Sequence, residues 1–146
     1  MKLRVLILCT GNSARSQMAE GLLRSLAGDK VQVFSAGTHP STVNPMAVEA
    51  MHERGIDISH HRSKHLSEFL GQPFDYVITV CDEAAEACPI FPGAAQHIHW
   101  SFPDPAAIEG SQEERLAFFR QIRDDIEARL RSWLTRLSEQ ATGSGS

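Results

Sequence analysis

Short, continuous apolar runs alternate along this chain with segments whose apolar residues recur at helical spacing. Such runs are typical of strands buried on both faces, and we expect strands over 3–8, 31–36, 74–80 and 96–100. Helical spacing or composition predicts helices over 16–27, 47–54, 66–70 and 82–87. Strands that alternate with helices form parallel sheets with right-handed crossovers. The predicted fold class is therefore α/β: a single three-layer domain in which helices flank a four-stranded parallel sheet.

The longest predicted helix lies near the C-terminus, where apolar residues recur in steps of three and four from Leu116 to Leu137. This spacing predicts an amphipathic helix of roughly six turns with a solvated charged face. The chain then becomes rich in Gly and Ser, so we expect a flexible tail over 141–146 and a domain over 1–140.

Length, charge and composition exclude several classes of protein. The 146 residues fit one domain, and a formal net charge of −4 provides no broad basic surface for nucleic acid. No apolar run approaches the roughly 20 residues of a membrane span, and the spacing of histidines and cysteines matches no common zinc pattern. We therefore expect a cytoplasmic protein without a metal site, which binds neither nucleic acid nor membrane. We also expect it to be a monomer.

A polar loop follows the first predicted strand and leads into the first predicted helix. Gly11 permits a tight turn with inward backbone N–H groups, and the helix adds its positive N-terminal end. Arg15 offers a planar fork to two oxygens of an anion, and the same positive field favours a Cys9 thiolate. The loop predicts a nucleophile beside a tetrahedral oxyanion, bound by Thr10, Gly11, Asn12, Ser13, Ala14, Arg15 and Ser16. Taken alone, the spacing is also compatible with a buried cysteine and a surface arginine.

Further motifs follow in order along the chain: Ser35-Ala-Gly37, Val80-Cys81-Asp82, Cys88-Pro89 and Asp104-Pro105. Together with the loop they resemble the thioredoxin-coupled arsenate reductases, which share the fold of the low-molecular-weight protein tyrosine phosphatases. The resemblance runs over nearly the whole chain, and the pair Cys81 and Cys88 is its most discriminating part. It implies arsenate as substrate, phosphate as a competing oxyanion, thioredoxin as electron donor and no tightly bound cofactor.

The resemblance also implies a role for each catalytic residue. Cys9 attacks arsenate held by Arg15, and Asp104 acts as the acid that assists loss of hydroxide. Cys81 then attacks the Cys9 sulfur, so that arsenite leaves and a Cys9–Cys81 disulfide remains. Finally Cys88 attacks Cys81, which frees Cys9 and leaves a Cys81–Cys88 disulfide for thioredoxin to reduce.

One departure from the family pattern concerns a cation. Some relatives bind potassium beside the loop, and Asn12, Glu20 and Ser35 match ligands of that site. Lys64 stands where those relatives have an aspartate. We hypothesise that its ammonium group takes the place of the cation; the alternative is an exposed loop lysine.

Two other functions remain open. The first is a low-molecular-weight tyrosine phosphatase that hydrolyses phosphomonoesters through a Cys9 phosphoenzyme. Such enzymes usually carry aromatic residues after Asp-Pro, whereas Ala106 and Ala107 follow here. The second is a non-enzymatic role with inert cysteines, either as an oxyanion-binding sensor or as a partner-binding module.

Overall fold

Four parallel strands form the centre of the protein, in the order β2-β1-β3-β4. The computed structural model describes residues 2–81, 91–92 and 94–144. The strands are β1 (Leu3–Cys9), β2 (Val31–Gly37), β3 (Phe74–Thr79) and β4 (Ala94–His99). Each overlaps a predicted strand, and all pairings are parallel. The predicted four-stranded parallel sheet is therefore confirmed.

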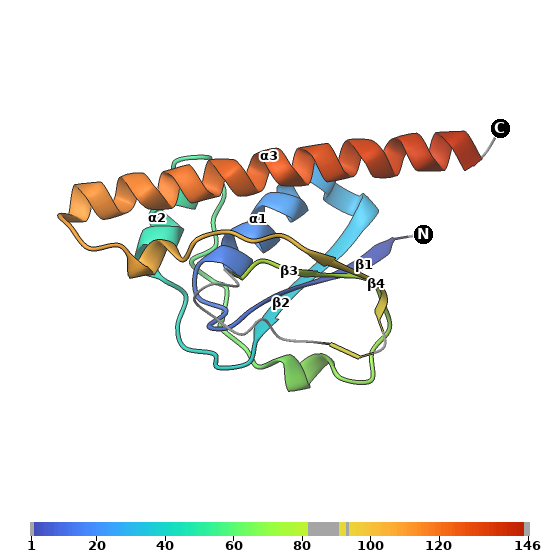
Figure 1. Ribbon diagram of the computed structural model, residues 1–146, viewed down its shortest axis with the longest axis horizontal. Helices are drawn as coiled ribbons and strands as arrows, with labels where there is room; N and C mark the ends of the chain where they lie inside the picture. Colours follow the sequence, from blue (N-terminus) through green and yellow to red (C-terminus); the bar gives the residue numbers. More distant parts are fainter. Residues whose placement is uncertain (1, 82–90, 93, 145–146) are drawn as a thin grey trace.

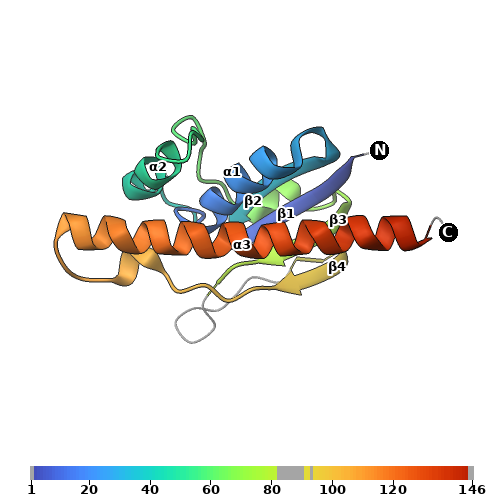
Figure 2. The ribbon, with the colours of Figure 1, turned by 90° about the horizontal axis from the view of Figure 1, so that it is seen from above.

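Helices α1 (Arg15–Ala27) and α3 (Gln112–Ser144) lie on one face of the sheet, and α2 (Pro45–His52) packs against both of them beyond the carboxyl ends of the strands (Figure 1). Seen from above, α3 runs the length of the molecule, with α1 and α2 on one side and β4 on the other (Figure 2). The opposite face of the sheet packs on Phe91 and on the short 3-10 helix Leu66–Phe69. Within the described residues, the core consists of two buried clusters, one on each face of the sheet.

The final helix is longer than the apolar spacing predicts. It has 33 residues, and it begins four residues before Leu116. Its start is a capping box, because the Glu114 amide donates to Ser111 Oγ and the Ser111 amide donates to Glu114 Oε1. The first turn is polar, so apolar spacing could not mark it. The helix also includes residues 141–144, where the sequence predicted the start of a flexible tail; the domain boundary at residue 140 stays a prediction.

The site-bearing end of the sheet is where the carboxyl ends of the strands meet. Cys9 and Gly37 are partners at the ends of β1 and β2, and the Val80 amide donates to the Leu8 carbonyl beyond the end of β3. Cys81 therefore follows β3 beside the end of β1. The predicted helix over 82–87 lies outside the described residues. Among the residues that are described, no helix is long and apolar enough to cross a membrane.

Candidate active site

The loop that follows β1 is held from outside through its carbonyl oxygens. Thr10 and Ser13 accept hydrogen bonds from the backbone amides of His39 and Asn44, both at 2.9 Å. The Gly11 carbonyl accepts from Ser63 Oγ at 3.0 Å. In a trans peptide the N–H points opposite to the carbonyl. Carbonyls that face outward therefore turn the following amides into the loop, where they form a concave site for an anion.

A pocket of about 190 Å³ opens inside this loop. Its lining comprises Cys9, Thr10, Gly11, Ser13, Ala14, Arg15, Asp104 and Ala106. Cys9 lies at the pocket and is only 3% exposed. The Thr10 hydroxyl is buried and has no hydrogen-bond partner among the described residues. The pocket thus combines a thiol, inward amides and an unused hydroxyl at a size that suits a small oxyanion.

Arg15 ties the pocket to the loop after β4. Its side chain is 4% exposed, and its guanidinium donates from Nη1 to the Phe102 carbonyl at 3.2 Å. Its Nη2 lies 4.0 Å from Asp104 Oδ2. Asp104 in turn caps the short 3-10 helix Pro105–Ala107, since its Oδ1 accepts from the Ala106 amide. The structure therefore brings Cys9, Arg15 and Asp104 to one pocket, as the sequence predicts.

Of the two relay cysteines, Cys81 lies among the described residues. Cys81 is fully buried and belongs to the same core cluster as Cys9. Adjacent strands lie about 4.8 Å apart, so the ends of β1 and β3 bring these residues to the same region of the sheet edge. Cys88 lies outside the described residues, and its predicted role stays a prediction.

Asn12 is the most constrained residue of the loop. It is fully buried and adopts a left-handed backbone with φ of 45°. Its Nδ2 donates to Ser16 Oγ at 2.8 Å and to Ser35 Oγ at 3.0 Å. Its Oδ1 accepts from the Lys64 amide at 2.9 Å. Asparagine tolerates this conformation better than most residues, and the surrounding contacts fix it.

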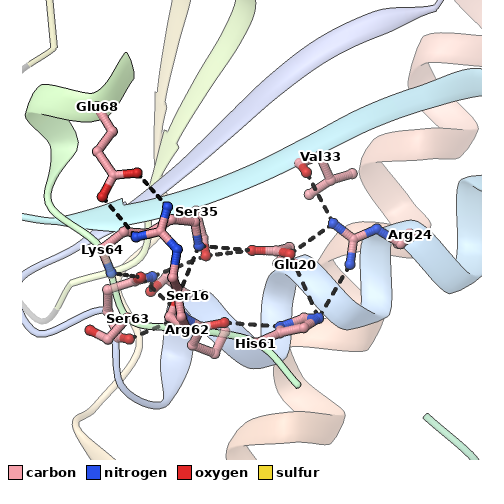
Figure 3. A network of polar contacts seen from close by, with 12 residues as sticks. Ser16, Glu20, Arg24, Val33, Ser35, His61, Arg62, Ser63, Lys64 and Glu68 are labelled. Carbon is pink, nitrogen blue, oxygen red and sulfur yellow. Dashed lines mark hydrogen bonds and ion pairs between the residues drawn. The ribbon is translucent and has the colours of Figure 1, made fainter. Parts of the chain in front are cut away.

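Charged side chains gather around the buried Glu20 (Figure 3), which shares the Ser35 hydroxyl with Asn12. Glu20 accepts from Ser35 Oγ at 2.5 Å and from Arg24 Nη2 at 2.7 Å. Lys64 Nζ lies 3.9 Å from Glu20 Oε1 and donates to the Arg62 carbonyl at 3.1 Å. Burial lowers the pKa of Lys64, while the nearby Glu20 carboxylate opposes that shift. The ammonium group thus lies beside Glu20, as the potassium hypothesis requires; that it replaces a cation stays a prediction.

Sequence reasoning missed the residues that hold the loop from distant segments. Ser63, His39 and Asn44 each donate to a loop carbonyl. No sequence motif marks this role, because these contacts join segments that only the tertiary structure brings together. No group of three His, Cys, Asp or Glu side chains that could hold a metal ion occurs within the described part of the chain.

Comparison with known proteins places this geometry in a family. Residues 4–142 match the low molecular weight phosphotyrosine protein phosphatase family. An arsenate reductase of Halalkalibacterium halodurans is 47% identical over 129 residues, which cover 88% of this chain and 93% of that protein. The arsenate reductase of Bacillus subtilis is 45% identical over the same shares. The chain belongs to the arsenate reductases of this family.

Solved structures of arsenate reductases have the same fold. One described as being in the phosphate binding state aligns with a TM-score of 0.75 and 32% identity, over 93% of this chain and 98% of that chain. The thioredoxin-dependent arsenate reductase of Corynebacterium glutamicum aligns with a TM-score of 0.72 and 30% identity. That alignment covers 95% of this chain and 63% of the other. The family and fold expected from the sequence are confirmed, and the phosphatases remain relatives in fold.

Proposed function

We propose that this arsenate reductase converts arsenate to arsenite by a relay of three cysteines, with thioredoxin as electron donor. The observation that carries the proposal is the placement of two buried cysteines at one sheet edge. Cys9 lies in a pocket of inward amides with Arg15, and Cys81 follows the adjacent strand in the same core cluster. A phosphatase needs the first of these cysteines and has no use for the second.

The first step forms a bond between sulfur and arsenic. The Cys9 thiolate attacks arsenate while Arg15 and the loop amides bind its oxygens. One As–O bond breaks, and Asp104 donates a proton so that the oxygen leaves as water. The product is a thioarsenate ester on Cys9 in which arsenic is still pentavalent.

The next steps move two electrons. The Cys81 thiolate attacks the Cys9 sulfur, so the S–As bond breaks with its electron pair on arsenic, and trivalent arsenite leaves. Cys88 then attacks Cys81, which releases the Cys9 thiolate and leaves a Cys81–Cys88 disulfide. The dithiol of thioredoxin reduces that disulfide and supplies the two electrons of the turnover. The proposal places the protein in the cytoplasm, because the three thiols must return to the reduced state. It also takes the protein to be a monomer.

The test is a coupled assay with arsenate, thioredoxin, thioredoxin reductase and NADPH. Wild type should consume NADPH in proportion to arsenate, and Cys9→Ser, Cys81→Ser and Cys88→Ser should each abolish repeated turnover. Hydrolysis of an aryl phosphate is measured in parallel. An enzyme that shows no arsenate turnover, but hydrolyses the ester equally well without Cys81 and Cys88, would be a phosphatase instead.

A further inference from the structure

Gln17 is a buried polar side chain on α1 that the proposed relay does not use. Its exposed fraction is 0%, and it lies two residues after Arg15. Its Nε2 lies 3.2 Å from the Asn12 carbonyl oxygen and 3.0 Å from Asn12 Oδ1. The same nitrogen lies 3.1 Å from the Arg62 carbonyl oxygen. One carboxamide thus contacts the backbone and the side chain of the left-handed residue of the oxyanion loop.

The orientation of this carboxamide is fixed by its surroundings. Three oxygen acceptors surround Nε2, so the nitrogen and not the oxygen must face Asn12. On the other side Gln17 Oε1 lies 3.0 Å from His61 Nδ1, which is then the protonated nitrogen of that ring. His61 and Arg62 therefore hold the amide in one rotamer that aims its donors at Asn12.

The Asn12 carbonyl depends on Gln17 in a way that its neighbours do not. The carbonyls of Thr10 and Ser13 accept from backbone amides, which no side-chain substitution removes. The Gly11 carbonyl has two donors, Ser63 Oγ and the Ser41 amide. Among the described contacts, the Asn12 carbonyl accepts from the Gln17 side chain alone. Since its outward direction turns the Ser13 N–H inward, one anion-binding amide depends on this side chain.

We propose that Gln17 is a positioning residue for the oxyanion, which aims the Ser13 amide into the pocket by holding the Asn12 carbonyl outward. The inference rests on the proposed function, since it assigns a further residue to the same site. Loss of Gln17 weakens oxyanion binding but leaves the thiol relay in place. One misaligned hydrogen bond to an anion corresponds to about a tenfold weaker affinity.

Two variants separate this role from a merely structural one. Gln17→Met keeps the length and removes the donor, whereas Gln17→Glu sets an oxygen against three oxygen acceptors. Ile126→Val is the control, because it trims a buried residue of α3 that does not line the pocket and makes none of the hydrogen bonds of the loop, while it still lowers stability. Inorganic phosphate is the probe, titrated into each reduced protein by calorimetry, and thermal unfolding is measured for all four proteins.

We expect the phosphate Kd and the arsenate KM to rise together, by about tenfold in Gln17→Met and further in Gln17→Glu. The turnover number at saturating arsenate should change much less, and Ile126→Val should bind phosphate like wild type. Equal phosphate affinity in wild type and both Gln17 variants would overturn this inference but not the proposed function. The same holds if the phosphate Kd rises in every variant, Ile126→Val included, in proportion to the loss in unfolding temperature. A wild type that binds no phosphate would overturn the proposed function, and with it this inference.

Discussion

Gly37 at the end of β2 is the position where a single added methyl group should disable the site. A Cβ atom there would lie 2.4 Å from the Thr10 carbonyl oxygen, 2.8 Å from the Cys9 carbonyl oxygen and 3.0 Å from the Asn12 amide nitrogen. All three atoms belong to the backbone of the oxyanion loop, so no side chain can rotate away. The predicted change is therefore Gly37→Ala.

The size of the effect follows from these distances. To restore even a tight separation of 3.0 Å, the Thr10 carbonyl must move by about 0.6 Å relative to β2. Overpacking of this kind costs about 1–3 kcal/mol of stability. A displacement approaching ~1 Å in a catalytic group lowers the rate by about a hundredfold. Because the loop carries both the Cys9 nucleophile and the anion-binding amides, we expect arsenate kcat/KM to fall by about that factor.

The coupled arsenate assay, phosphate calorimetry and thermal unfolding together test this reasoning. Gly28→Ala is the matched control: it strains a residue with φ of 56° at the end of α1 and meets no atom within 4 Å. It should cost a similar ~1–2 kcal/mol yet leave kcat/KM unchanged. If Gly37→Ala binds phosphate and turns over arsenate like wild type, the loop does not depend on this close approach and the argument is wrong.

Three further outcomes follow from the structure. Wild-type turnover should not depend on potassium, whereas potassium should activate Lys64→Asp. The substitution removes the ammonium group and places a second carboxylate beside Glu20, which leaves negative charge for a cation to balance. Turnover rates in potassium and in a bulky organic cation at equal ionic strength measure this. Asp104→Asn should slow single-turnover thioarsenate formation by about 10²–10⁴-fold with little change in phosphate Kd. Hydrogen bonds and charges from Arg120 and Arg123 hold the pKa of Glu53 below its ordinary value. That stabilisation is present above the ordinary pKa and is lost as pH falls through the lowered one, so the unfolding temperatures of wild type and Glu53→Gln should converge in acid.

The sheet and the loop could be predicted because both are encoded locally. Apolar runs mark strands regardless of what they pack against, and the loop from Cys9 to Arg15 carries its glycine, nucleophile and cation within seven residues. The length of α3 could not be predicted from apolar spacing, since its first turn is polar. The capping pair Ser111 and Glu114 was a usable signal for that start.

The residues that hold the loop from distant segments could not be predicted from the sequence. Ser63 lies 52 residues from Gly11, and His39 meets Thr10 only because β2 pairs with β1. Their contacts exist only after the sheet has formed. Gln17 carries a stronger sequence signal, because a glutamine beside the apolar face of the first helix needs hydrogen-bond partners if it is buried. Its answer still required the position of the segment around Arg62.

The burial of the first two thiols gives a physical reason for a third. Thiol–disulfide exchange requires an attacking thiolate to reach the target sulfur, so access limits the rate as much as the acidity of the thiols does. A disulfide between Cys9, which is 3% exposed, and Cys81, which is 0% exposed, would lie within the core cluster where a protein reductant has no path to either sulfur. A second exchange that transfers the disulfide from Cys9 to another cysteine then follows from the architecture: Cys9 can stay buried in its pocket and still be regenerated by an external dithiol.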